Sequence, residues 1–274
     1  YTKNNGKVVI IDADTRNSDV FRIHKNYISD KRYILRIELS SKDGWLSLED
    51  SIEEIYNENQ NIDIDFVISL PAGMGATFNS ELKTFRQSIA KYNQKIVLFW
   101  SMDTGIDSIN LLKDVFLNCY DCIDHIAVAK NLYFGENENF HLWNDSNLRI
   151  LLLGLGATEA AMPGLHTRLI PYYKKMKFDE TYIKELILKN NIKYPKIIDE
   201  NRDNDRYDGE PMPFFKMFDD DVQMKGSTKH RLMMWLNGTD EMDGMMQMFR
   251  AADIQANTGE FKEKCAKIVF NTTN

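Results

Sequence analysis

The chain has 274 residues, of which 43% are hydrophobic and 27% are charged, and its formal net charge is -7. This length is enough to bury a substantial core in one domain, or in one domain with an appendage, and the acidity argues against a non-specific coat on nucleic acid. Three cysteines without a disulfide framework indicate a reducing, cytoplasmic environment, and no apolar run approaches the roughly 18 residues that span a bilayer.

The first half of the chain alternates short apolar runs with segments of helical periodicity. Continuous runs of β-branched and aliphatic residues are typical of strands covered on both faces, and apolar residues three or four positions apart predict helices. Strands are predicted at 8–11, 33–37, 66–68, 96–100 and 125–128, and helices at 45–56, 82–92 and 109–116. This alternation predicts right-handed crossovers and an α/β fold, with a doubly wound, mostly parallel sheet and flanking helices.

Beyond about residue 140 the pattern becomes mainly helical. Asp145 or Ser146 is predicted to cap a helix that ends at Gly154 or Gly156. Residues 199–210 are dense in charge, which predicts a solvated loop. Further helices are predicted at 179–187, 229–236 and 241–252.

Acidic residues follow the first predicted strand. Asp12 and Asp14 are two positions apart, so on a strand they point to the same face. In doubly wound sheets ligands bind outside the carboxyl ends of the strands, where two such carboxylates are able to order a metal-bound water. The alternative is that they cap the following helix and make turn hydrogen bonds.

Two other strand ends carry groups with binding chemistry. The segment from Ser69 to Gly75, SLPAGMG, has glycines that let backbone amides approach a phosphate, although a tight turn alone also explains them. The carboxamide of Asn131, after the strand at 125–128, is able to pair with a purine edge or to serve a turn.

Four segments, VVIIDADTRNSDV, DFVISLPAGMG, KIVLFWSMD and IAVAKN, stand in the order found in one known group of proteins. They resemble the ParA/MinD family of deviant Walker-motif ATPases, and more narrowly the MobD/StbB type of mobile plasmids and conjugative elements. The resemblance covers roughly residues 1–178 and implies a SIMIBI-type P-loop NTPase fold. In that family a strand, a glycine-rich phosphate loop and a helix precede the strand ending D-x-D. Residues 1–6 look like the end of that helix, so we expect the first strand and the phosphate loop upstream of Tyr1.

The resemblance assigns roles position by position. Asp12 and Asp14 match the switch-I acids, which position the attacking water and the Mg²⁺ shell, and these two residues are therefore the expected catalytic pair. Asp12 is also the expected metal-contacting acid. Asn131 falls near the position that contacts the base of the nucleotide.

The switch-II motif D-x-P-A-G is matched with one departure. Pro71, Ala72 and Gly73 fall on its proline, alanine and glycine and are expected to contact the nucleotide. Ser69 stands where the family has an acid. Its hydroxyl is able to contact the metal through a bound water but adds no negative charge, so the departure implies weaker metal binding or slower turnover.

The resemblance implies an ATP- and Mg²⁺-dependent switch in plasmid or conjugative-element mobilisation, partition or positioning. Slow hydrolysis, a homodimer with ATP, and DNA or a relaxase or partition protein as partner are part of that expectation. Two alternatives stay open: a non-hydrolysing pseudo-ATPase adaptor, and an unrelated α/β enzyme for metal-assisted phosphoryl transfer.

The expected domains are an N-terminally truncated ParA-like nucleotide-binding domain at 1–195, an acidic loop at 196–225 and a helical C-terminal extension at 226–274. Without its first strand the chain is expected to be unstable or to aggregate.

Three further features favour structural roles. The C-x-x-C at Cys119 and Cys122 ends a predicted helix and has no second pair for zinc. The segment 151–161, LLLGLGATEAA, lacks the third glycine of a dinucleotide fingerprint, because Glu159 stands there. The C-terminal methionines are interpreted as core filling, with an adaptable partner-binding face as the alternative. They are Met224, Met233, Met234, Met242, Met245, Met246 and Met248.

Overall fold

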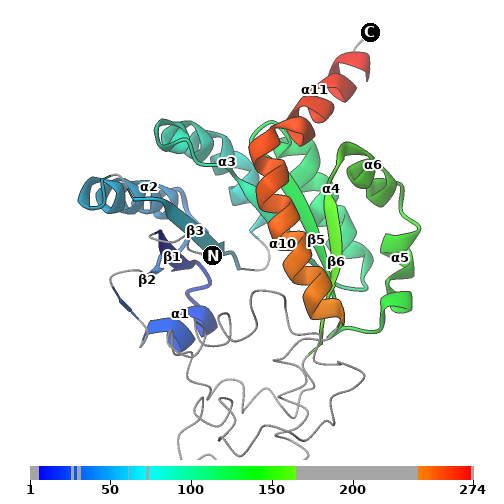
Figure 1. Cartoon of the computed structure of the whole chain (residues 1–274), viewed down its shortest axis with the longest axis horizontal. Coiled ribbons are helices and arrows are strands. Elements are labelled where there is room, and N and C mark those ends of the chain that lie inside the picture. The colour runs from blue at the N-terminus through cyan, green and yellow to red at the C-terminus, as the bar shows by residue number, and fades with distance from the viewer. Residues whose placement is uncertain are drawn as a thin grey trace, which may run out of the picture. The chain divides into compact units, whose positions relative to one another are not determined.

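In the part of the chain that the structure describes, two three-stranded sheets of parallel strands are present, ordered β2-β1-β3 and β4-β5-β6 (Figure 1). The structure, a computed structural model, describes residues 6–25, 28–29, 32–60, 62–71, 74–164 and 240–272. The chain divides into two compact units, with residues 1–96, 110–124 and 262–274 in the first and residues 97–109 and 125–261 in the second. The α/β prediction is confirmed, although the structure has two three-stranded sheets where the sequence predicted one sheet.

The first sheet is built around β1. Its unit contains β1 (Lys7–Asp12), α1 (Asp19–His24), β2 (Arg32–Arg36), α2 (Lys42–Glu58), β3 (Ile64–Ser69), α3 (Gly75–Ile89) and the 3₁₀ turn η2 (Ala90–Tyr92). Parallel pairing sets Val9 beside Tyr33 of β2 and Phe66 of β3. Val9 and Ile11 are fully buried, as expected for the central strand of a parallel sheet.

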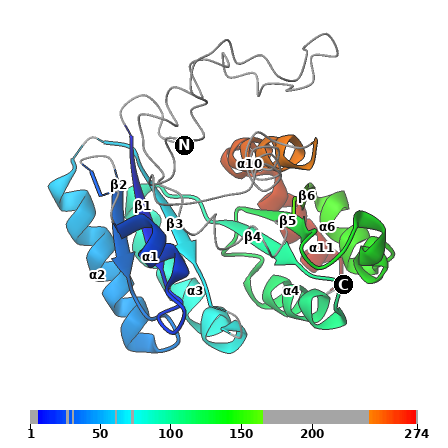
Figure 2. The ribbon, with the colours of Figure 1, turned by 90° about the horizontal axis from the view of Figure 1, so that it is seen from below.

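The helices α2 and α3 lie side by side and share an aromatic core (Figure 2). Trp45 of α2 contacts the rings of Phe78 and Phe85 of α3, with ring centroids 6.1 Å and 5.5 Å apart. Its indole Nε1 donates a 3.0 Å hydrogen bond to the carbonyl oxygen of Leu39, which satisfies the polar atom of a buried ring. Ser41 caps α2 by accepting a hydrogen bond from the Gly44 amide.

The second sheet lies in the second unit. The elements after β3 and its helix are β4 (Val97–Met102), α4 (Ile106–Cys119), β5 (His125–Asn131), η3 (Asn137–Phe140), α5 (His141–Asn144), α6 (Asn147–Leu155), β6 (Thr158–Met162), α10 (Asp240–Thr258) and α11 (Glu260–Thr272). The central strand β5 is buried along nearly its whole length. The predicted helix caps are confirmed, since Ser146 accepts from the Arg149 amide and Gly156 ends α6 in the left-handed conformation.

The helix α10 covers one face of the second sheet (Figure 1). Met248 and Ala252 of α10 form a buried cluster with Ala127 and Ala129 of β5, and Met245 packs against its edge. Alanines on the strand let the helix approach closely, and the flexible thioethers fill the remaining space. The core-filling interpretation holds for these two methionines, and α10 is part of the second unit's core. Nothing is described of the other methionine side chains in that cluster.

Several elements differ from the sequence prediction. The strand β6 and the helices α1 and α11 were not predicted, and α3 begins at Gly75, directly after the Pro-Ala-Gly corner. The helices predicted at 179–187 and 229–236, the loop at 199–210, the helix end at 1–5 and the domain boundaries near 195 and 225 lie outside the described residues.

Each sheet has an apolar edge strand. β3 ends the order of the first sheet and β4 ends the order of the second. Although β3 has the continuous apolar run of a buried strand, Val67 is 54% exposed, and Phe99 of β4 is 45% exposed. An exposed apolar edge presents unpaired backbone groups to which a further strand is able to add.

No described helix combines the length and the apolar character needed to cross a membrane.

A close approach at the start of α2 yields a first prediction. A Cβ on Gly44 would overlap the carbonyl oxygen of Glu38, whereas a Cβ on Gly154 of α6 meets nothing within 4 Å. We expect Gly44→Ala to destabilise the protein by about 2 kcal/mol or more, because the new methyl group fits only if the backbone at Glu38 or Gly44 moves. Gly154→Ala, the matched control, should be neutral or stabilising by up to about 1 kcal/mol. Urea denaturation measures both, and equal midpoints for the two variants would contradict this packing.

The buried imidazole at the start of β5 yields a second prediction. Burial lowers the pKa of His125 from 6.5 to about 4. Between these values the unfolded chain takes up a proton that the folded chain does not, so stability falls as the pH falls through this window. From pH 7 to pH 5 the loss should be about 1–2 kcal/mol. His125→Gln should remove that part of the slope, measured by urea denaturation at each pH, and an unchanged slope would show that His125 is not its source.

Candidate functional site

The carboxyl edge of the first sheet brings three predicted site residues together. The β1–β3 register places Asp12 opposite Ser69, and the amide of Ala13 donates a 2.9 Å hydrogen bond to the carbonyl oxygen of Ser69. Asp14 follows on the same strand end. These residues, Asp12, Asp14 and Ser69, are called the acid edge below.

Asp12 is held by the backbone around it. Only 1% of its surface is exposed. Its Oδ2 accepts a 2.7 Å hydrogen bond from the amide of Phe21, in the first turn of α1, and its Oδ1 accepts one of 3.2 Å from the amide of Asp14. The capping and turn bonds weighed as the alternative for this residue are therefore present. They fix the carboxylate in one orientation at the sheet edge.

Asp14 is less constrained than Asp12. It is half-buried, its Oδ1 accepts a 3.1 Å hydrogen bond from the amide of Asn17, and its backbone carbonyl accepts one from the hydroxyl of Ser18. Its Oδ2 makes no hydrogen bond with any described residue. Asp14 is thus the member of the acid edge with an oxygen available to a water or a ligand.

The corner after β3 leads directly into α3. Ser69 and Pro71 are partly exposed, and α3 starts at Gly75 without a side-chain cap on its first amides. Uncapped amides at the start of a helix favour an anion. The predicted contacts Ala72 and Gly73 lie outside the described residues.

Asn131 lies in the second unit, at the carboxyl end of β5. Its Oδ1 accepts a 3.1 Å hydrogen bond from the amide of Tyr133, so the carboxamide closes the turn that follows the strand. Its amide nitrogen makes no hydrogen bond with any described residue, and the base-contacting role stays a prediction.

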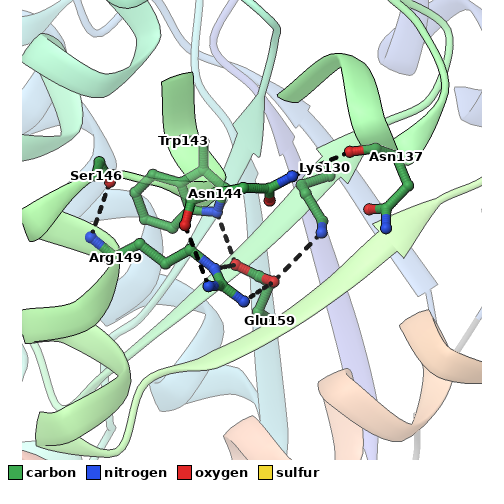
Figure 3. Close-up of polar contacts among 7 residues, drawn as sticks. All are labelled: Lys130, Asn137, Trp143, Asn144, Ser146, Arg149 and Glu159. Carbon is green, nitrogen blue, oxygen red and sulfur yellow. Dashed lines mark hydrogen bonds and ion pairs between the residues drawn. The ribbon is translucent and has the colours of Figure 1, made fainter. Parts of the chain in front are cut away.

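Beside Asn131 the structure shows a group of charged side chains that the sequence reading missed (Figure 3). The Glu159 carboxylate of β6 accepts hydrogen bonds from Trp143 Nε1 at 2.7 Å, Arg149 Nε at 2.9 Å and Arg149 Nη2 at 3.1 Å. Lys130 Nζ of β5 lies 3.4 Å from Glu159 Oε1. Lys130, Trp143, Arg149 and Glu159 are called the charged cluster below.

The charged cluster holds Glu159 ionised. Burial alone raises the pKa of Glu159, but the hydrogen bonds from Arg149 and Trp143 and the charge of Lys130 outweigh it, so the pKa lies below its usual value.

The signal in the sequence was a lysine and a glutamate inside otherwise apolar strands, IAVAKN and TEAAM. Charged residues are rarely buried unless paired, so such positions indicate a paired or functional charge.

The C-x-x-C pair is buried. Burial raises the pKa of Cys119 and of Cys122 to about 11. Both are therefore thiols at neutral pH rather than the thiolates that bind metals or attack disulfides.

The acid edge has the donors that Mg²⁺ prefers. Among the described residues, no three His, Cys, Asp or Glu side chains gather into a protein-only metal cage. Mg²⁺ usually takes one or two carboxylates together with waters and substrate phosphates, so the Asp14 carboxylate and the Ser69 hydroxyl suit it without such a cage. Both oxygens of the buried Asp12 already accept amide hydrogens, and its expected metal contact stays a prediction.

Comparison with known proteins gives one informative match. The chain is 27% identical to Protein MobD of Acidithiobacillus ferrooxidans over 193 residues, which are 69% of this chain and 79% of that protein. No family model matches, and no solved structure matches. The similarity over most of the chain supports a relation to MobD proteins.

The bonds of Asp12 yield a third prediction. Asp12→Ala leaves the Phe21 and Asp14 amides without their acceptor and should cost about 1–3 kcal/mol of stability. Asp12→Asn keeps one oxygen acceptor and should cost less. Asp50→Ala, at an exposed position of α2, is the control and should change stability by less than about 0.5 kcal/mol. Urea denaturation that ranks Asp12→Ala with the control would remove the capping role.

Proposed function

We propose that this chain is a MobD-related, ParA-like ATPase switch in the mobilisation, partition or positioning of a plasmid or conjugative element. The observation that carries the proposal is the pairing of Asp12 with Ser69, since it puts the switch-I-like acids next to the switch-II-like corner. The similarity to Protein MobD over 69% of the chain supports the same assignment.

The two acids have different roles in this proposal. Both oxygens of Asp12 are held by backbone amides, so Asp12 fixes both the geometry of this sheet edge and the electric field there. Asp14, with one free oxygen, orders the attacking water. Mg²⁺ bound with ATP would neutralise charge on the phosphates. Ser69 would face the metal's water shell without adding charge, which would make hydrolysis slow.

The free edge of β3 supports a further strand beside it. A parallel strand that pairs with β3 would satisfy the backbone groups of this edge and end at the same carboxyl edge as Asp12. In the family that the chain resembles, the phosphate loop follows such a strand. We propose that a strand carrying such a loop pairs with β3 in the nucleotide-binding state.

Slow hydrolysis suits a switch. A protein that pairs with a second copy in its ATP state, and engages DNA or a relaxase or partition protein in that state, is released when the nucleotide is hydrolysed. The partner's different affinity for the two nucleotide states carries the signal. A slow step then sets how long the partner stays bound.

The test uses the full-length protein. We expect ATP binding with Mg²⁺, dimerisation that depends on ATP, and a low turnover. Ser69→Asp restores the family's acid and should raise turnover about tenfold or more. Ser101→Asp, which adds the same charge at an exposed position near the end of β4, is the control and should leave turnover unchanged.

The same measurements separate the alternatives. ATP binding with no turnover in either Ser69 form would indicate a pseudo-ATPase adaptor, the function favoured by the missing acid. Phosphate release without ATP-dependent dimerisation would indicate an unrelated phosphoryl-transfer enzyme. Failure of the full-length protein to bind ATP would contradict the proposal.

A further inference from the structure

The charged cluster contains one more positive charge than it needs. Arg149 binds both oxygens of Glu159 and Trp143 donates to one of them, so this glutamate is already paired. Lys130 is nevertheless buried, with 8% of its side chain exposed, and its one partner among the described residues is Glu159 at 3.4 Å. A buried ammonium is costly unless its hydrogens find acceptors. The surplus charge of Lys130 therefore calls for another acceptor.

An open cavity lies beside Lys130. It has a volume of about 440 Å³, and its lining consists of Lys130, Leu132, Glu136, Asn137, Glu138, Glu159, Ala160 and Ala161. It lies where β5 and the loop after it meet β6, all within the second unit. The cavity is thus large enough for a small organic molecule, and the surplus ammonium is in its wall.

The wall of the cavity is fixed by α5 and α6. Asn144 Nδ2 donates a 3.1 Å hydrogen bond to the carbonyl oxygen of Asn137, and Arg149 Nη1 donates one of 3.3 Å to the carbonyl oxygen of Asn144 (Figure 3). Glu136 and Asn139 close the loop through a reciprocal capping box. These bonds connect the loop that carries the two acids to the charged cluster, so the cavity is formed before a ligand arrives.

The charges around the cavity are of both signs. Lys130 supplies a cation in the wall, whereas Glu136 and Glu138 supply exposed carboxylates. Glu138 makes no hydrogen bond or ion pair with any described residue. A simple anion that approaches Lys130 meets two carboxylates, and a simple amine meets a buried ammonium. A ligand that carries both charges complements both parts.

We propose that this cavity binds a small zwitterion, with its carboxylate on Lys130 and its ammonium group at Glu138 and Glu136. The ligand class is the amino acids and related amino carboxylates. This site belongs to the second unit and does not depend on nucleotide binding at the acid edge.

The test is isothermal titration calorimetry on the full chain with a series of amino carboxylates: glycine, β-alanine, 4-aminobutanoate and 6-aminohexanoate. The series varies the distance between the two charges, and we expect one length to bind best. Acetate and ethylammonium, which each carry one of the charges, should bind at least tenfold more weakly than the best member.

Variants assign the two contacts. Lys130→Met removes the ammonium at nearly constant length and should weaken the best ligand at least tenfold. Glu138→Gln, at an exposed position, should weaken the best ligand about threefold or more, whereas acetate should bind no more weakly than before, because a repelling carboxylate is removed. Lys267→Met, in an exposed ion pair with Glu263 on α11, is the matched control and should bind normally.

Three results would overturn the proposal. They are no binding by any member of the series at millimolar concentration, acetate binding as tightly as the best zwitterion, and normal binding by the Glu138→Gln variant. The last measurement decides the question even if the Lys130→Met variant fails to fold.

Discussion

The register of β1 against β3 determines what the carboxyl edge of the first sheet contains. Side chains alternate along a strand, so a shift by one residue would turn Asp12 and Asp14 to the opposite face and move Ser69 away from them. The register is fixed by core packing, because Val9 and Ile11 of β1 are fully buried. The amide of Ala13 adds a bond to Ser69 at the edge itself. The apolar interior thereby positions the polar residues on which the proposed function rests.

In the second sheet, too, buried apolar residues position the polar ones, although the side chains differ. Alanines on one face of β5 let α10 pack closely against the strand. Lys130 lies on the opposite face of β5, beside Glu159 of β6. Burying these charges is costly, and the pairing of Glu159 with Arg149 and Trp143 offsets that cost for the glutamate alone. Lys130 has Glu159 as its one charged partner among the described residues, at 3.4 Å, and it lines the cavity. Asp12 and Ser69 in the first sheet and Lys130 in the second lie toward the carboxyl ends of parallel strands, where the α/β architecture leaves backbone and side chains open to ligands.

The sequence predicted the elements whose signal is local. The runs VVII and IAVA lie in the central strands β1 and β5, and the helical spacing of apolar residues around Leu48 and Ile52 lies in α2. The strand β6 was missed because TEAAM contains one β-branched residue and two alanines, and its strand form comes from pairing with β5.

The contacts at the candidate site were predictable only in part, because only some of them follow from local sequence patterns. The neighbourhood of Asp12 and Ser69 follows from parallel strands and the order of the motifs. The bond from the Phe21 amide to Asp12 depends on how the chain turns between them, and the meeting of Lys130 with Arg149 and Glu159 depends on three separate elements. No local pattern encodes contacts of that kind.

The central claim is that the acid edge faces the metal of a bound nucleotide. Paramagnetic Mn²⁺, substituted for Mg²⁺ in the ATP complex of the full-length protein, tests this most directly by NMR. The account predicts that the amide signals of Asp14 and Ser69 broaden together, while that of the exposed Asp50 on α2 stays sharp. Sharp signals from both Asp14 and Ser69 in a saturated Mn²⁺–ATP complex would contradict it.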